Sequence, residues 1–441
     1  MSCLEHTTLS RRNLLAGTTS LALWGMLPKM AIAGTRDPRF LTIVLRGAVD
    51  GLALAAPVGD PDYVRLCGKL AVPKEGAGAG LPLDGFFALN GAMPYLHSLY
   101  LKREVMIIHA VATPYRGRSH FDGQDVLESG LGGVARSDTG WLNRALAGLS
   151  HAGTSEPQKG LAMGAVVPLV MRGTAPVMSW TPKANNLPLR DQTVERLMDL
   201  YAHTDAGLAK AFAEGMAIDR VATAGADEAA AAMMSNPAMG PAMAGGMMAA
   251  KPSAAQPAPV AAKSAPAPRP FREFIEAAEA AAKFMTTTGG PRIGALSFDG
   301  WDTHANEGSV SGPLAGRFGG LDASIRAFAE GMGPAWKDTV VLLVTEFGRT
   351  ARANGTSGTD HGTGTVAIVL GGGVKGGRVL ADWPGLRDAD LYEGRDLKPT
   401  RDLRAVTKGI LRDHLGIPDG ALAEVVFPGS SEVRGVEGLL G

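Results

Sequence analysis

An α/β fold with a mostly parallel central sheet is predicted, because short apolar runs alternate along the sequence with segments of helical spacing. The apolar runs are rich in β-branched residues and bounded by Gly or polar residues, as buried strands are. They cover residues 41–45, 105–110, 293–298, 340–345 and 365–370. Helical spacing covers residues 90–103, 271–285, 321–332 and 400–415. Polar clusters follow several of the apolar runs, at the edge where parallel sheets collect their ligands.

Residues 1–33 have the features of an export signal. Ser10-Arg11-Arg12 precedes a mildly apolar run from Leu14 to Leu27, and Ala31-Ile32-Ala33 has the form of a cleavage site. The paired arginines resemble a twin-arginine signal, which would export the folded protein to the periplasm. An ordinary signal peptide and a chance arginine pair are the alternatives. No later stretch has about 18 consecutive apolar residues, so we expect no membrane span.

The composition excludes some classes of function. The 441 residues include 43 basic and 43 acidic side chains and no basic run, so nucleic-acid binding has no electrostatic support. Cys3 lies in the signal and Cys67 is then alone, which excludes an intrachain disulfide. We expect one α/β domain over residues 34–441. It is interrupted at residues 222–270 by an Ala/Pro/Met-rich insertion, whose composition predicts disorder.

The first strand runs into a Gly-rich turn that carries Arg46 and Asp50. Such a turn is a common place for ligand groups, and a solvated turn with an Asx-type hydrogen bond is an equal alternative.

A helix is expected after the second strand, beginning at Ser119. Ser119 with Asp122 three residues later resembles a capping box, which is the structural interpretation. The functional interpretation is that amide dipoles, Arg118 and His120 favour a bound oxyanion there. Ser119 would then be a nucleophile or a metal ligand.

Asp302 and His304 follow the strand at residues 293–298. Their spacing of two places both side chains on the same side of an extended backbone. Carboxylate and imidazole together are common ligands of zinc and similar ions. The alternative is a polar loop with a hydrogen bond between the two side chains.

The segment between the last two apolar runs carries Glu346, Arg349, Asp360 and His361. A carboxylate at the end of a buried strand is costly unless it is paired or binds a cation. Asp360 and His361 are flanked by glycines, which allow the backbone to approach a ligand closely. They precede a strand, however, and would have to fold over the edge where the other clusters lie.

Several motifs occur in an order that resembles the exported bacterial proteins of domain-of-unknown-function family 1501. They are RGAVDGL, RSHFDGQDVLESG, TGWLNR, GWDTH, TEFGRT and GTDHG. That family is placed in the alkaline phosphatase and sulfatase superfamily, so the resemblance implies an alkaline-phosphatase-like fold, one or two divalent metals and a Ser, Thr or modified Cys nucleophile.

By this resemblance Asp50 matches an early metal-binding Asp, and Ser119 lies near the nucleophile position. Asp302 with His304 matches a metal-binding pair, and His361 a late metal-binding His. The chain departs from the pattern at TEFGRT, where Phe347 follows Glu346 instead of an Asp-His pair. Asp302 and His304 are also closer together than the usual pair. A one-metal site or a non-catalytic protein is therefore an alternative.

The predicted function is hydrolysis of small phosphate or sulfate esters in the periplasm, with Ser119 or a water as the nucleophile. Arg118 and Arg349 would hold the oxyanion. Zinc is the expected metal, with manganese and calcium as alternatives. The expected ligands are Asp50, Asp302, His304, Glu346, Asp360 and His361. The alternative function is a non-catalytic periplasmic binding or assembly protein that keeps the fold.

Overall fold

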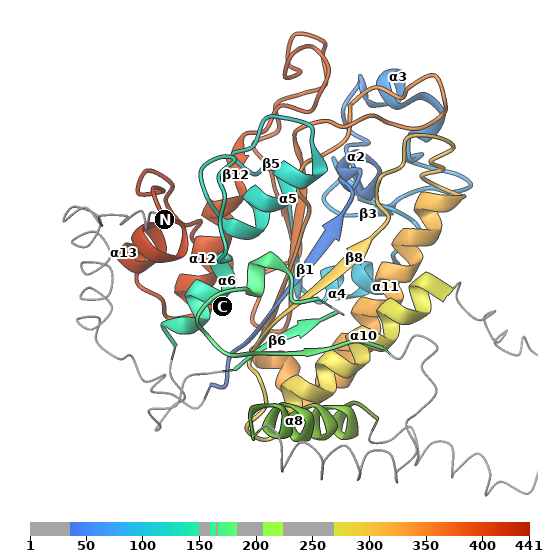
Figure 1. Cartoon of the computed structure of the whole chain (residues 1–441). Helices are drawn as coiled ribbons and strands as arrows, with labels where there is room; N and C mark the ends of the chain where they lie inside the picture. Colours follow the sequence, from blue (N-terminus) through green and yellow to red (C-terminus); the bar gives the residue numbers. More distant parts are fainter. Residues whose placement is uncertain (1–35, 150–158, 165, 183–205, 224–268) are drawn as a thin grey trace, which may run out of the picture.

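The computed structural model describes residues 36–149, 159–164, 166–182, 206–223 and 269–441 (Figure 1). The predicted export signal and residues 224–268 of the predicted insertion lie outside these ranges. Within them, none of the helices combines the length and the apolar character that crossing a membrane requires.

Nine strands of the described residues form one large sheet, and the α/β prediction is confirmed. The sheet order is β11-β5-β10-β9-β1-β8-β6-β7, and β12 pairs with β5. The strands are β1 (Arg39–Arg46), β5 (Val105–Ala112), β6 (Gly160–Met163), β7 (Val177–Trp180), β8 (Ile293–Asp299), β9 (Thr339–Val344), β10 (Thr365–Leu370), β11 (Arg378–Leu380) and β12 (Arg401–Asp402). A small sheet pairs β4 (Ala88–Leu89) with β2 (Ala55–Ala56) and β3 (Leu81–Pro82).

Within the large sheet, β10 runs opposite to all the other strands. It pairs antiparallel with β5 and with β9, whereas the remaining pairs are parallel. The carboxyl ends of the parallel strands therefore lie at one edge, and the start of β10 lies there too. Residues that follow β1, β5, β8 and β9 consequently meet residues that precede β10.

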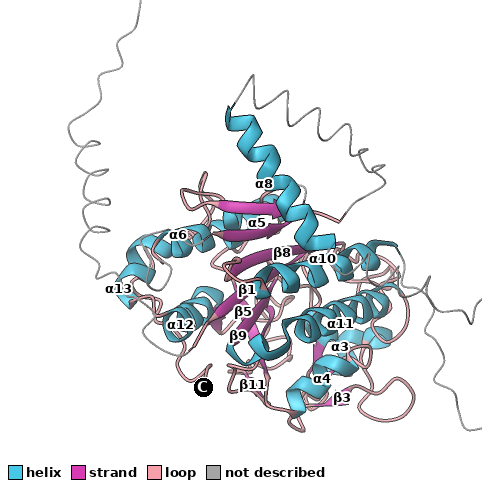
Figure 2. Ribbon diagram, turned by 90° about the horizontal axis from the view of Figure 1, so that it is seen from below, coloured by secondary structure: helices cyan, strands magenta, loops and turns pink. Residues whose placement is uncertain are grey.

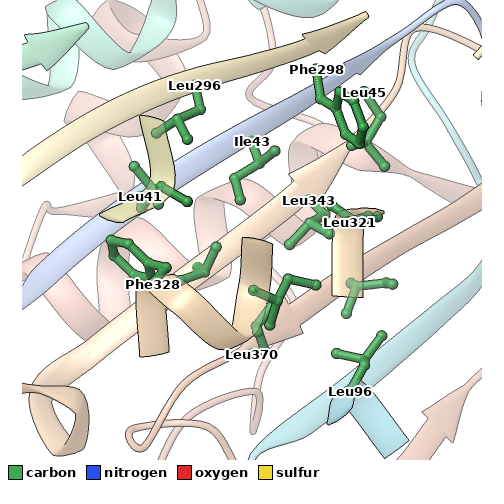
Figure 3. Close-up of a cluster of buried hydrophobic side chains, with 14 of the residues drawn as sticks. Leu41, Ile43, Leu45, Leu96, Leu296, Phe298, Leu321, Phe328, Leu343 and Leu370 are labelled. Atoms are coloured by element: carbon green, nitrogen blue, oxygen red, sulfur yellow. The ribbon is translucent and has the colours of Figure 1, made fainter. Parts of the chain in front are cut away.

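Helices cover both faces of the sheet (Figure 2). Because side chains alternate along a strand, Leu41, Ile43 and Leu45 of β1 point into the core formed with α4 (Pro94–Leu101), α10 (Arg269–Thr286) and α11 (Pro313–Met332) (Figure 3). Phe40 and Val44 point into the opposite core, which α6 and α12 cover. Burying each such side chain contributes about 1.5–3 kcal/mol to folding, so the apolar runs determine which segments become strands.

The helices are α2 (Gly51–Leu54), α3 (Tyr63–Cys67), α4 (Pro94–Leu101), α5 (His120–Ser129), α6 (Trp141–Ala147), α8 (Ala206–Thr223), α10 (Arg269–Thr286), α11 (Pro313–Met332), α12 (Leu403–Leu415) and α13 (Asp419–Ala421). Short 3-10 turns cover η1 (Gly68–Leu70), η2 (Leu169–Met171) and η3 (Gly333–Asp338), and η4 (Leu422–Val426) is a π-helical turn. The helix predicted over residues 321–332 thus begins eight residues earlier, at Pro313. Gly320 explains the difference, because a Cβ there would lie 2.8 Å from the ring of Phe271 in α10. Glycines at the α10 contact weaken the helical signal but let the two helices pack closely.

Candidate metal centre

Three histidines and an aspartate converge at the carboxyl edge of the sheet. His361, before β10, places its Nε2 atom 3.0 Å from His120 Nε2 and 2.9 Å from His304 Nε2. Asp302 Oδ1 lies 3.1 Å from His361 Nε2 and 2.9 Å from His304 Nε2. Asp302 Oδ2 lies 3.4 Å from His120 Nε2. The ligand atoms of His120, Asp302 and His361 all lie within 4.8 Å of one another, and His304 Nε2 lies beside two of them.

The other ring nitrogen of each histidine faces an oxygen atom. His120 Nδ1 lies 2.8 Å from Glu346 Oε1, and His361 Nδ1 lies 2.8 Å from the carbonyl oxygen of Arg118. His304 Nδ1 lies 3.4 Å from Asp360 Oδ1. These oxygens accept hydrogen bonds, so each Nδ1 can carry the ring proton. In that tautomer the Nε2 lone pairs of the three rings face the other members of the cluster.

In this neutral tautomer, hydrogen bonds among the Nε2 atoms and Asp302 do not satisfy the arrangement. A neutral imidazole whose proton is on Nδ1 has only an acceptor at Nε2, and three acceptors and a carboxylate about 3 Å apart repel one another. A divalent cation between them removes the repulsion. Ligand atoms around a tetrahedral zinc lie about 3.3 Å apart, given a zinc–nitrogen distance of about 2.0 Å. Histidines whose Nδ1 is held by an oxygen are also the usual form of metal-ligating histidine.

Asp302 is held in its ionised form by a buried arginine. Arg349 Nη1 donates to Asp302 Oδ1 over 2.6 Å, and the Arg349 side chain is 0% exposed. Partial burial raises the pKa of Asp302, but the hydrogen bond and charge of Arg349, with His304 and His120, bring it below its ordinary value. Arg349 Nε also donates to Thr359 Oγ1 over 3.1 Å, so its guanidinium is fixed from two sides.

Glu346 holds His120 from a fully buried position at the end of β9. Its Oε1 accepts from the Gly47 amide over 2.8 Å and from Gln124 Nε2 over 3.1 Å. Burial raises the pKa of Glu346, but these bonds and His120 outweigh it and lower the pKa. The Glu346 hydrogen bond in turn raises the pKa of His120, against the opposite effect of burial. Gly47 (φ +114°) is required here because a Cβ would lie 2.6 Å from the Asp302 amide nitrogen.

The structure places Asp50 away from the four converging side chains. Its carboxylate caps α2 by accepting from the Leu52 and Ala53 amides over 2.9 and 3.0 Å. Burial raises the pKa of Asp50, against the opposite effect of the hydrogen bonds from the Ala53 and Leu52 amides and of the charge of Arg349. Burial and the charge of Asp50 raise the pKa of Glu307 to about 8. These two residues form a separate buried carboxyl pair.

Ser119 caps α5, accepting from the Asp122 amide over 3.4 Å as in the structural interpretation. The Arg118 guanidinium lies between two carboxylates, 2.7 Å from Glu393 Oε2 and 3.1 Å from Asp396 Oδ2. The Arg118 guanidinium thus faces these two carboxylates. Arg118 meets the histidine cluster through its backbone carbonyl oxygen, which lies 2.8 Å from His361 Nδ1.

The comparison with protein families decides where the chain belongs. The family described as "Protein of unknown function (DUF1501)" matches residues 107–426. The chain belongs to this family. The match includes all four converging residues of this DUF1501 protein, and a search of curated proteins found no match.

Solved structures similar to this DUF1501 protein are remote. The phosphonate monoester hydrolase of Agrobacterium radiobacter is 12% identical, with 91% of this chain and 79% of that chain covered and a TM-score of 0.39. Ps i-CgsB in complex with k-i-k-neocarrahexaose is 12% identical, with 78% and 68% covered and a TM-score of 0.31. The C-terminal periplasmic domain of EcEptC from Escherichia coli, in complex with Zn, is 8% identical, with 78% and 76% covered and a TM-score of 0.26. At these TM-scores the similarity assigns no activity to the chain.

The sequence analysis assigned His120 to oxyanion binding and not to the metal, and it assigned no role to Glu307. His120 had a usable signal, because it follows a strand of the same sheet as Asp302 and stands beside Ser119, which was singled out. Glu307 had none. It lies in a loop after β8 and becomes buried only because Thr303 and Thr359 donate to its two oxygens, each over 2.9 Å.

Proposed function

We propose that this DUF1501 protein is an exported, metal-dependent hydrolase of phosphate or sulfate esters. One observation carries the proposal: His120, Asp302 and His361 bring two imidazole nitrogens and an ionised carboxylate within 4.8 Å of one another at the ligand-binding edge of an α/β sheet. The side chains of Asp302 and His304 are 39% and 46% exposed, so the point is open to solvent and to a small substrate.

His120, Asp302 and His361 would hold a divalent cation, and His304 would be a further ligand from beside them. Imidazoles together with one carboxylate favour zinc over calcium, which prefers oxygen ligands throughout, and manganese is the second alternative. When bound, such a cation polarises an ester oxygen and stabilises the charge that develops on it.

The surrounding residues have positioning roles in this proposal. Glu346 and Asp360 keep the Nδ1 protons of His120 and His304 away from the centre. Arg349 is buried against Asp302, so we assign it to orienting that carboxylate, although an oxyanion-binding role was expected.

The same proposal leaves two nucleophiles, a water at the centre or the hydroxyl group of Ser119, which directly precedes His120. Ser119→Ala distinguishes them. Turnover that persists with an unchanged maximal rate identifies water, and loss of turnover with retained metal identifies Ser119.

The decisive experiment is elemental analysis of the folded protein beside an Asp302→Ala/His361→Ala double variant. We expect about one equivalent of metal in the parent protein and none in the variant. His97→Ala, at a half-buried histidine of α4 outside the cluster, is the matched control and should retain the metal. Absence of metal from a folded parent protein would refute the proposal.

Turnover is then measured with an aryl phosphate and an aryl sulfate. Hydrolysis that disappears in the double variant but persists in His97→Ala supports the proposed hydrolase function. Bound metal without turnover of any ester supports the alternative, a non-catalytic exported binding or assembly protein.

A further inference from the structure

A polar cavity of about 370 Å³ adjoins the candidate metal centre. It lies between α5, the end of β1 and the segments around residues 136–138 and 166–172. Gln124 of α5 lines it and also donates to Glu346, which holds His120. Gln124 is one helical turn from His120, or about 6 Å along the helix axis. The cavity and the metal centre therefore share a wall.

A second connection runs through the end of β1. Arg46 lines the cavity, and the next residue, Gly47, donates its amide proton to Glu346. The carbonyl oxygen of Arg46 accepts from the Trp301 amide, directly before Asp302. A molecule that reaches the centre through one group can therefore place its remainder in this cavity.

Charges of both signs line the cavity in equal number. They are three arginines and three carboxylates, namely Arg46, Arg136, Arg172, Asp125, Glu128 and Asp138. Arg46 and Glu128 neutralise each other across 2.5 Å. Glu128 Oε2 also accepts a hydrogen bond from the Val170 amide over 3.0 Å.

The remaining charged groups are available to a ligand. Arg172 uses its Nε to bond the Val167 carbonyl oxygen over 2.9 Å, which leaves its terminal nitrogens. The side chains of Arg136, Asp125 and Asp138 have no hydrogen bond or ion pair to any residue of the described ranges. Donors and acceptors are thus presented together, without net charge.

An exposed aromatic ring stands at the same cavity. Phe121, the residue after His120, is 85% exposed, and Val166 on the other side is 71% exposed. They are two of the five exposed large hydrophobic residues of the described ranges. An aromatic face left in water beside paired donors and acceptors is a surface that a ligand with an apolar face and several hydroxyl groups would cover.

We propose that this cavity binds a polyhydroxylated group, such as a sugar ring, that forms the alcohol part of the ester; this rests on the proposed function. Hydroxyl groups both donate and accept, so they satisfy Arg136 as well as Asp125 and Asp138. The C–H face of a sugar ring packs on Phe121. A polyanion would meet three carboxylates, and a purely apolar group would leave buried charges without partners. The volume is within the range of small-molecule sites.

The test uses uncharged methyl glycosides of glucose, galactose and mannose, which carry no ester. Binding to the full mature chain is measured by saturation-transfer NMR and titration calorimetry. We expect at least one glycoside to bind, with affinity lowered roughly three- to tenfold in Phe121→Ala and lowered further in Phe121→Ala/Asp125→Ala. Val64→Ala is the matched control, because Val64 is 66% exposed on α3 and outside this cavity.

The outcomes separate the two proposals. Glycoside binding that Phe121→Ala leaves unchanged would overturn the placement in this cavity. Absence of glycoside binding from a protein that holds metal and hydrolyses esters would overturn the subsite and leave the proposed function standing. Binding that depends on Phe121 in a protein without metal would support the cavity while the proposed function fails.

Discussion

Glu346→Gln is the perturbation that tests the candidate metal centre most sharply, because it removes one charge and almost no volume. Glu346 Oε1 accepts from His120, Gly47 and Gln124, and Oε2 accepts from Thr345 Oγ1 over 2.9 Å. A glutamine can keep its oxygen toward the first three donors and turn its amide toward Thr345 Oγ1, which can accept. The fold should therefore tolerate the change.

The expected effect is on metal affinity. The second ring nitrogen of a ligating histidine is usually held by a carboxylate or carbonyl oxygen, and loss of such a partner weakens metal binding about 10- to 100-fold. This corresponds to about 1.4–2.8 kcal/mol. Competition with a chromophoric chelator measures the affinity, and Glu330→Gln, an exposed glutamate of α11, is the matched control.

A second readout comes from the pH titration of His120 in the metal-free protein. The Glu346 hydrogen bond is the main reason that the His120 pKa is raised, so NMR should find a lower His120 pKa in Glu346→Gln. Because the folded pKa of His120 is above the unfolded pKa of 6.5, protonation of His120 stabilises the fold. This contribution is complete below pH 6.5 and is lost as the pH rises through the folded pKa. Unchanged metal affinity together with an unchanged His120 pKa would refute the role assigned to Glu346.

Three further predictions concern Asp50, Glu307 and export. Asp50→Ala should lower the free energy of unfolding by about 1 kcal/mol through the lost α2 cap while metal content stays unchanged; loss of metal would make Asp50 a ligand. Glu307 has a folded pKa of about 8 against 4.5 when free, so its folded state binds the extra proton and stability should fall as pH rises between these values. Glu307→Gln should remove this dependence, which is worth up to about 5 kcal/mol, and denaturant unfolding at pH 5 and pH 9 would detect it; equal pH slopes in both proteins would contradict the assignment. Arg11→Lys/Arg12→Lys should retain the protein in the cytoplasm, as cell fractionation would show, and undiminished export would exclude the twin-arginine route.

The strands could be predicted from sequence because they are buried on both faces. Each predicted apolar run lies within β1, β5, β8, β9 or β10, apart from Thr345, which follows the end of β9. The spacing of Asp302 and His304 also indicated a shared direction, and both meet His361 in the structure. These signals are local, and local spacing is what a sequence displays.

The role of Glu346 could not be predicted in the same way. A carboxylate at the end of a buried strand needs a partner, and both a cation and a hydrogen-bond donor meet that need. Its partners, Gly47, His120 and Gln124, come from two other parts of the chain. Whether a cation or a donor meets that need depends on distances that arise only when β1, β5 and β9 are assembled in one sheet.

The direction of β10 decides whether the centre exists at all. Its six buried residues look the same in either direction, and only pairing with β5 and β9 shows that it is antiparallel. A parallel β10 would begin at the opposite edge of the sheet, about 20 Å away by the length of six extended residues, and His361 could not reach Asp302. Because β10 returns toward that far edge, the chain between Val344 and Thr365 leaves and re-enters the sheet at one place. Glu346, Arg349 and His361 are brought together for that reason, so the single reversed strand completes the centre.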